Sequence, residues 1–263
     1  MNRAPRFYHS GETEDVGFVV GLLRERFPTR PLMAIGFSLG GNILLKFLGE
    51  QGVKNAAPVS AAVAISVPYD LSAGAASLER GGMVRIYSGY FLRSLLAKAH
   101  AKEEILANVL DLDAVRASTT IRDFDEATTA RLHGFADAED YYRNSSSNQF
   151  LQSVRIPTLL LHSRDDPFLS LEALPLSAIE ANPFLTLVLT DRGGHVGFFE
   201  EGHLGIRPFG WRSKGRRSWL TIISTPQQRP TTRIPSHPDG LTRTPRVFSV
   251  APFEGIQSGA GRT

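Results

Sequence analysis

The chain has 263 residues, of which 42% are hydrophobic and 21% charged, a composition typical of a globular protein. It contains no cysteine, which excludes disulfides, thiolate metal sites and a cysteine nucleophile. No apolar run approaches the roughly 20 residues that span a bilayer, and the N-terminal residues lack the apolar core of a signal peptide. We therefore expect a cytoplasmic protein without an integral membrane segment.

The net charge of +3 is divided unevenly along the chain. Residues 205–263 contain ten Lys and Arg but only two acids, so the preceding residues are net acidic. The same segment has seven prolines and no sustained hydrophobic periodicity. Because it also lacks clustered basic residues interleaved with aromatics, we predict a disordered basic tail that does not bind nucleic acid.

The first predicted element is an amphipathic helix with Ser10 as its N-cap. Its apolar residues follow the spacing of a buried helical face, and they are Val16, Val19, Val20, Leu23 and Phe27. Proline at positions 28 and 31 ends this helix.

Four short apolar runs are predicted to be parallel strands, over residues 32–35, 63–67, 158–161 and 185–189. Each run is largely unalternating, as expected for strands covered on both faces. A helix is predicted after the first strand, over residues 41–49, with Gly52 as its C-terminal stop. The alternation of strands and helices predicts an α/β fold with a mostly parallel sheet in residues 1–204.

A long insertion, residues 71–150, separates the second predicted strand from the third. It is too long for a bare loop in a compact domain, and residues 89–110 in particular have a helical pattern. We predict a helical cap over the site. The alternative is an ordinary crossover helix with extra packing elements.

The pentapeptide GFSLG at residues 36–40 lies between the first predicted strand and the following helix. A serine in this setting is a nucleophile elbow, in which small neighbours at Gly36 and Gly40 let the strand and the helix approach. Ser38 then lies at a helix N-terminus, where the dipole favours developing negative charge. The N–H of Leu39 is a candidate oxyanion donor. The alternative is a glycine-rich turn in which Ser38 only caps the helix.

A serine nucleophile needs a base, and the base needs an orienting acid. Asp166 follows the third predicted strand, and His195 follows the fourth. Because the carboxyl ends of parallel strands meet at one edge of a sheet, we predict that Ser38, Asp166 and His195 come together. Asp165 is the alternative acid, although it could instead pair with Arg164 or cap the following turn.

At these residues the sequence resembles the YheT-like α/β-hydrolases, the fourth AB-hydrolase family, in which the chain order is also Ser, Asp, His. The likeness is carried by residues 8–15, 36–42, 67–71, 165–168 and 193–198. It implies a serine hydrolase of carboxylic esters, such as acylglycerols or other lipid esters. It assigns the nucleophile to Ser38, the acid to Asp166 and the base to His195. We expect no cofactor, and no metal because the other histidines lack metal-ligand spacing.

Two parts of the family pattern are not matched. The resemblance implies several strands before the elbow, with a His-Gly-rich loop that supplies a second oxyanion donor, and a closing helix behind the histidine. We therefore expect an N-terminally truncated hydrolase fold with an exposed apolar edge at the elbow strand, and an atypical tail from Gly205. The competing hypothesis is a catalytically impaired fragment or pseudoenzyme of the same fold. The oligomeric state is not predicted.

Overall fold

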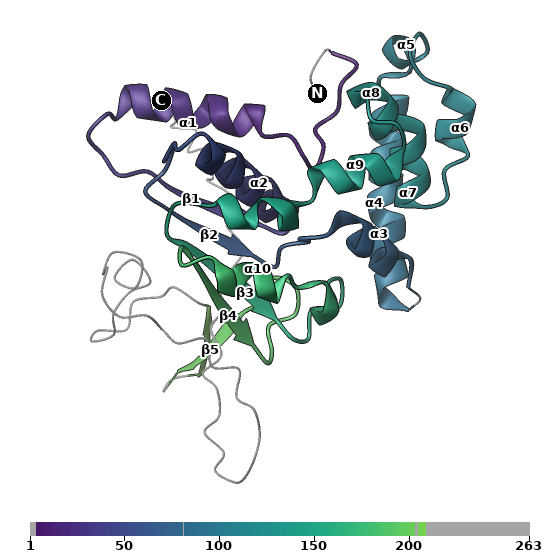
Figure 1. The fold of residues 1–263 in the computed structure, drawn as a ribbon. Coiled ribbons are helices and arrows are strands. Elements are labelled where there is room, and N and C mark those ends of the chain that lie inside the picture. Colours follow the sequence, from purple (N-terminus) through teal and green to yellow (C-terminus); the bar gives the residue numbers. More distant parts are fainter. Residues whose placement is uncertain (1–3, 81, 203–204, 209–263) are drawn as a thin grey trace, which may run out of the picture.

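The computed structural model describes residues 4–80, 82–202 and 205–208. Its centre is a four-stranded parallel sheet in the order β1-β2-β3-β4 (Figure 1). The strands are β1 (Met33–Phe37), β2 (Ala61–Ile65), β3 (Thr158–Ser163) and β4 (Leu185–Thr190). All four predicted strands are confirmed, and their ends differ from the prediction by at most two residues. Because the strands are parallel, their carboxyl ends lie at one edge of the sheet.

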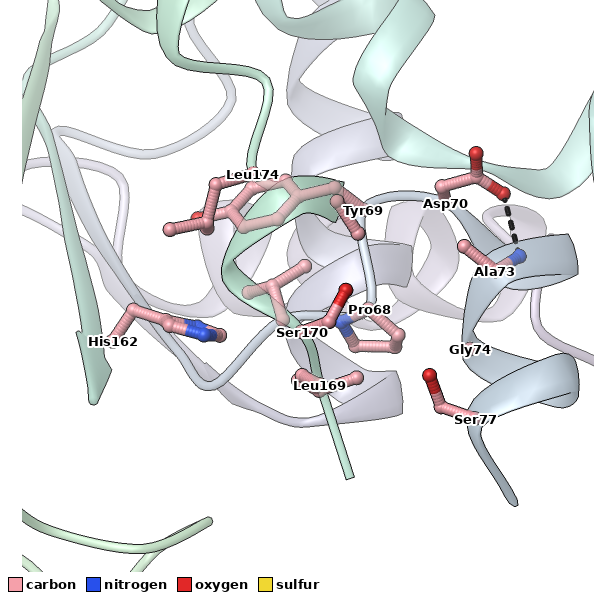
Figure 2. Close-up of a pocket in the computed structure, with 12 residues that line it drawn as sticks. Pro68, Tyr69, Asp70, Ala73, Gly74, Ser77, His162, Leu169, Ser170 and Leu174 are labelled. Carbon is pink, nitrogen blue, oxygen red and sulfur yellow. Dashed lines mark hydrogen bonds between the residues drawn. The ribbon is translucent and has the colours of Figure 1, made fainter. Parts of the chain in front are cut away.

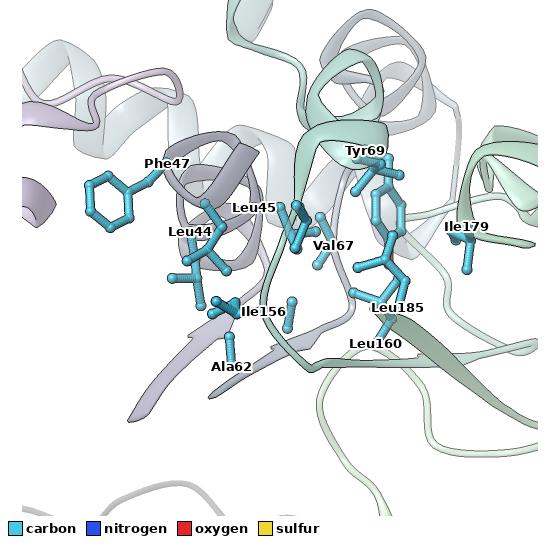
Figure 3. Close-up of a cluster of buried hydrophobic side chains, with 14 of the residues drawn as sticks. Leu44, Leu45, Phe47, Ala62, Val67, Tyr69, Ile156, Leu160, Ile179 and Leu185 are labelled. Atoms are coloured by element: carbon cyan, nitrogen blue, oxygen red, sulfur yellow. The ribbon is translucent and has the colours of Figure 1, made fainter. Parts of the chain in front are cut away.

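The main core lies between this sheet and the helices α2 (Leu39–Val53) and α10 (Leu176–Ala181). Figure 3 shows Leu44 and Leu45 of α2 above Ala62 of β2. The core continues to Leu160 on β3 and Ile179 on α10. This apolar packing fixes the direction of α2 against the sheet, and the N-terminus of α2 carries Ser38.

Helix α2 is longer than predicted at both ends, and Gly52 lies inside it rather than stopping it. A Cβ at Gly52 would lie 1.7 Å from the carbonyl oxygen of Ser153, and a Cβ at Gly49 would lie 2.4 Å from that of Phe150. Both carbonyls belong to the 3-10 segment η2 (Ser147–Ser153). The glycines therefore serve a close approach of two backbones, which a helix-termination pattern does not reveal.

The first helix, α1 (Glu14–Arg26), begins three residues later than predicted, with Thr13 in place of Ser10 at the N-cap position. Thr13 precedes it without a side-chain cap, and the N–H of Ser10 instead donates to the hydroxyl of Tyr141 at 2.9 Å. The expected buried face is only partly confirmed. Val16 and Val20 pack against the core, whereas Val19 and Leu23 are exposed because no described element covers that side.

The insertion between β2 and β3 is helical, as predicted. It comprises α3 (Leu71–Glu79), α4 (Met83–His100), α5 (Glu103–Leu106), α6 (Leu112–Arg116), α7 (Ile121–Phe124), the π-helical η1 (Asp125–Ala130), α8 (Arg131–His133) and α9 (Ala138–Ser145). The helix predicted over residues 89–110 is divided between α4 and α5. Figure 1 shows these helices gathered to one side of the sheet, and we call them the cap. The cap has its own core, centred on Leu106 and Phe124.

After β4 the chain forms the strands β5 (Phe199–Gly202) and β6 (Gly205–Pro208), which pair antiparallel. The disordered tail predicted from Gly205 is therefore wrong for its first residues, because they pair with β5. The rest of the predicted tail, residues 209–263, lies outside the described residues. The short 3-10 turn η3 (Leu171–Ala173) precedes α10.

The apolar edge expected at the elbow strand is present. Among the described strands β1 pairs only with β2, and its side chains Met33, Ile35 and Phe37 are exposed. In the part of the chain that the structure describes, no helix is long and apolar enough to cross a membrane.

Candidate active site

Ser38 lies at the junction of β1 and α2, in the strained backbone that a nucleophile elbow requires. Its φ of 48° and ψ of −121° are unusual for a residue with a side chain. Its N–H donates to the carbonyl of Ile65 at 2.8 Å, which ties the turn to the neighbouring strand. The hydroxyl makes no capping hydrogen bond. The alternative role of Ser38 as a simple helix cap is therefore wrong.

Two glycines make this turn possible, and they are not the pair that the motif suggests. A Cβ at Gly36 would lie 2.5 Å from the carbonyl oxygen of Gly40, and a Cβ at Gly41 would lie 2.6 Å from Cγ2 of Val67. A Cβ at Gly40 would meet no atom within 4 Å. The close approach of strand and helix therefore depends on Gly36 and Gly41, and the role predicted for Gly40 is wrong.

The structure brings Ser38, His195 and Asp166 into one hydrogen-bonded row. Nε2 of His195 lies 2.8 Å from Oγ of Ser38, and Nδ1 lies 2.8 Å from Oδ2 of Asp166. The side chain of Asp166 is fully buried and that of His195 is 19% exposed. One imidazole nitrogen can thus hold its proton toward the carboxylate while the other accepts a proton from the serine.

The carboxylate of Asp166 is held by the loop that follows β3. Its Oδ1 accepts the N–H groups of Phe168 at 2.9 Å and Leu169 at 3.2 Å, which leaves Oδ2 for His195. The two candidate acids therefore differ in what they contact. Asp166 meets the imidazole, whereas Asp165 points to the backbone of the loop that follows β4 and carries His195, which we call the histidine loop.

Asp165 anchors that loop. Its Oδ1 accepts the N–H of Gly194 at 2.7 Å and the hydroxyl of Ser163. Burial alone would raise the pKa of Asp165, but these hydrogen bonds lower it below its ordinary value. The pairing with Arg164 that was one option for Asp165 is not formed, since Nε of Arg164 lies 3.3 Å from a carboxylate oxygen of Asp191.

The histidine loop has further supports that sequence reasoning missed. The hydroxyl of Ser66, a fully buried residue with φ of 50°, donates to the carbonyl oxygen of His195. A Cβ at Gly193 would lie 2.6 Å from the ring of Phe198, which is itself fully buried. These residues fix the direction of the imidazole. The only sequence signal for Ser66 is its place at the end of a strand beside the elbow.

Asn42 is a second residue whose role the sequence did not reveal. Its side chain is fully buried, and its amide nitrogen donates to the carbonyls of Ser10 at 2.9 Å and Ser145 at 2.8 Å. Its Oδ1 accepts the N–H of Ser147 at 2.9 Å. One side chain thus joins α2, one turn after Ser38, to the N-terminal segment and to the end of the cap.

A small pocket lies where the cap meets the sheet. Figure 2 shows that its lining includes Tyr69, which precedes α3, together with Ser77 of α3 and His162 of β3. Among the described residues, neither ring nitrogen of His162 nor the hydroxyl of Tyr69 has a hydrogen-bond partner. Burial lowers the pKa of His162 and raises that of Tyr69, so both groups are uncharged at neutral pH.

The predicted oxyanion donor Leu39 is the first residue of α2, where backbone N–H groups have no helical partner. Its role in catalysis stays a prediction. Within the described ranges, no three His, Asp or Glu side chains are grouped closely enough to hold a metal ion.

The parallel sheet, the strained elbow and the Ser–His–Asp row together define the α/β-hydrolase class. A model of the α/β hydrolase fold matches residues 2–202, and the chain belongs to this family. Its sequence is 39% identical to that of the YheT protein of Escherichia coli (strain K12) over 222 residues, which make up 84% of this chain and 64% of that protein. The resemblance inferred from the motifs is thereby confirmed.

Two further relatives have names that state an activity. Phospholipase ABHD3 of Mus musculus is 37% identical over 196 residues, or 74% of this chain and 47% of that protein. Monoacylglycerol lipase of Saccharomyces cerevisiae is 34% identical over 203 residues, or 75% of this chain and 44% of that protein. This chain therefore spans 44% to 64% of the lengths of these three relatives.

Proposed function

We propose that this chain is a serine hydrolase that cleaves carboxylic esters through an acyl-enzyme on Ser38. The observation that carries the proposal is the row of two 2.8 Å contacts from Ser38 through His195 to Asp166. The names of the three relatives, an esterase, a phospholipase and a monoacylglycerol lipase, support esters, and the last two support lipid esters in particular.

In this mechanism Oγ of Ser38 attacks the ester carbonyl as Nε2 of His195 takes its proton. Asp166 holds Nδ1–H and stabilises the imidazolium that forms. His195 then returns the proton to the leaving alcohol. A water molecule, activated by the same imidazole, attacks the acyl-enzyme and releases the acid. The N–H of Leu39, at the positive end of α2, donates to the oxyanion in both steps.

A fluorophosphonate probe tests the nucleophile directly, because it phosphonylates an activated serine. The wild type and Ser60→Ala, which changes an exposed serine away from the site, should be labelled equally. Ser38→Ala should abolish labelling. Turnover of p-nitrophenyl esters of graded acyl length should follow the same pattern and define the preferred chain.

Two results would contradict the proposal. Labelling that survives in Ser38→Ala would place the nucleophile elsewhere. Folded wild-type protein that is never labelled and hydrolyses no ester would favour the impaired form of this fold. The exposed apolar side chains of β1 are the observation that keeps that alternative in view.

A further inference from the structure

Helix α4 carries apolar side chains on two sides. One side packs into the core of the cap through Leu92 and Ala99. The other side is exposed and bears four apolar residues at positions i, i+1, i+4 and i+5, which share one face of a helix: Ile86, Tyr87, Tyr90 and Phe91. We call these four residues the α4 apolar face. A helix that faces water ordinarily carries polar residues on its outer side, so this face is suited to contact with an apolar phase.

The α4 apolar face is continuous with the candidate active site. The ring of Tyr87 meets that of Phe168 edge-on at 5.4 Å, and Phe168 meets the imidazole of His195 in the same manner at 5.0 Å. Leu39 and Val196, which follow the nucleophile and the base in the chain, are exposed as well. An apolar phase in contact with α4 would therefore lie beside the reacting groups.

Along the chain the charge beside this face is of one sign, and the acid Glu172, from another segment, lies near Arg80. No Asp or Glu occurs between Glu79 and Glu103, and the exposed basic residues in this stretch are Arg80, Arg85, Arg93 and Lys98. Basic residues beside exposed apolar side chains are typical of helices that lie in the interface of an anionic membrane, and tyrosine is enriched at membrane–water interfaces. Each basic residue near such a surface adds about 1 kcal/mol of attraction.

We propose that the α4 apolar face and its flanking arginines dock this protein on an anionic lipid surface, with the active site turned toward that surface. This deepens the proposed function, since it means that the ester is taken from an assembled lipid phase. Docking itself needs no turnover, so it is measured separately from hydrolysis.

Cosedimentation of the full chain with lipid vesicles tests the proposal. Wild-type protein should bind vesicles of phosphatidylcholine with phosphatidylserine more tightly than vesicles of phosphatidylcholine alone. The double variant Ile86→Ser/Tyr90→Ser removes the two most exposed members of the face, at 70% and 64%, and avoids the ring that contacts Phe168. It should weaken binding to both vesicles at least about tenfold, because two inserted apolar side chains are lost.

A matched control removes equally exposed apolar groups from other places. Val53→Ser/Val109→Ser changes one residue at the end of α2 and one in the cap after α5, and it should bind as the wild type does. Arg85→Gln/Arg93→Gln should lose only the gain from phosphatidylserine, by roughly fivefold per residue. Circular dichroism should show the same folded spectrum for all variants, since every changed side chain is exposed.

Three outcomes would overturn the docking surface: no vesicle binding by the wild type, equal loss in the valine control, or no loss in the Ile86 and Tyr90 variant. If the wild type is a dimer that this variant dissociates and it binds no vesicles, a second copy covers the face instead. Vesicle binding without any ester hydrolysis would contradict the proposed function and leave docking intact. Ester hydrolysis without vesicle binding would contradict docking and leave the proposed function intact.

Discussion

Asn42 offers a sharp test of how the site is supported. Replacing it by alanine removes three hydrogen bonds to backbone groups, at Ser10, Ser145 and Ser147. Ser145 and Ser147 are themselves buried, so the freed carbonyl and N–H cannot turn to water. Each unsatisfied buried group costs about 1–3 kcal/mol. Ser10 is partly exposed and adds little. Asn42→Ala should therefore lose about 2–6 kcal/mol, a large part of a stability that is typically about 5–15 kcal/mol.

Urea unfolding followed by far-ultraviolet circular dichroism measures this loss. The matched control is Asn144→Ala, which removes two exposed hydrogen bonds to Asp140 and should change stability by less than about 0.5 kcal/mol. Ester hydrolysis by Asn42→Ala should also fall, because Asn42 fixes the first turns of α2 and hence Ser38. If Asn42→Ala unfolds at the same urea concentration as the wild type, the claim that the Asn42 side chain joins the three segments is refuted.

Three more changes test the local geometry. Gly41→Ala places a Cβ 2.6 Å from a methyl carbon of Val67, so it should lower the free energy of unfolding by about 1–3 kcal/mol, measured in urea. Gly40→Ala places its Cβ in open space and should lower it little. Equal losses in the two variants would contradict this packing. Asp166→Asn should lower kcat for a p-nitrophenyl ester on the order of 10³–10⁴-fold, because it loses the carboxylate that holds His195. Asp165→Asn keeps an acceptor for the N–H of Gly194 and should lower kcat by less than about tenfold. The reverse order of effects would identify Asp165 as the acid. Burial and a neighbouring histidine lower the pKa of His9 to about 4. In the unfolded chain His9 has its ordinary pKa of about 6.5 and takes up a proton at a higher pH than in the folded chain. The free energy of unfolding should therefore fall as the pH drops from about 6.5 toward 4. His9→Asn, which keeps an acceptor for the same backbone N–H, should flatten that fall in urea unfolding, and parallel curves for the two proteins would show that His9 does not contribute.

The sequence by itself determined the sheet and the chemistry of its edge. Unalternating apolar runs predicted four parallel strands, because strands covered on both faces need no polar side. The setting of GFSLG between a strand and a helix predicted the elbow. The positions of Asp166 and His195 after later strands predicted that they would meet Ser38, since parallel strands end at a common edge. All of these inferences use features that are local in the chain or follow from strand direction alone.

Only the tertiary structure decided which of two residues adjacent in sequence performs a given role. Asp165 and Asp166 are adjacent in sequence, and only the fold directs one to the imidazole and the other to the loop backbone. Gly41 rather than Gly40 faces Val67, and Asn42 meets Ser145 across about a hundred residues of chain. The exposed side of α4 is likewise invisible in its periodicity, because an apolar pattern does not state which of its faces is covered. These contacts join residues far apart in the chain, so their partners are fixed by packing and not by local sequence.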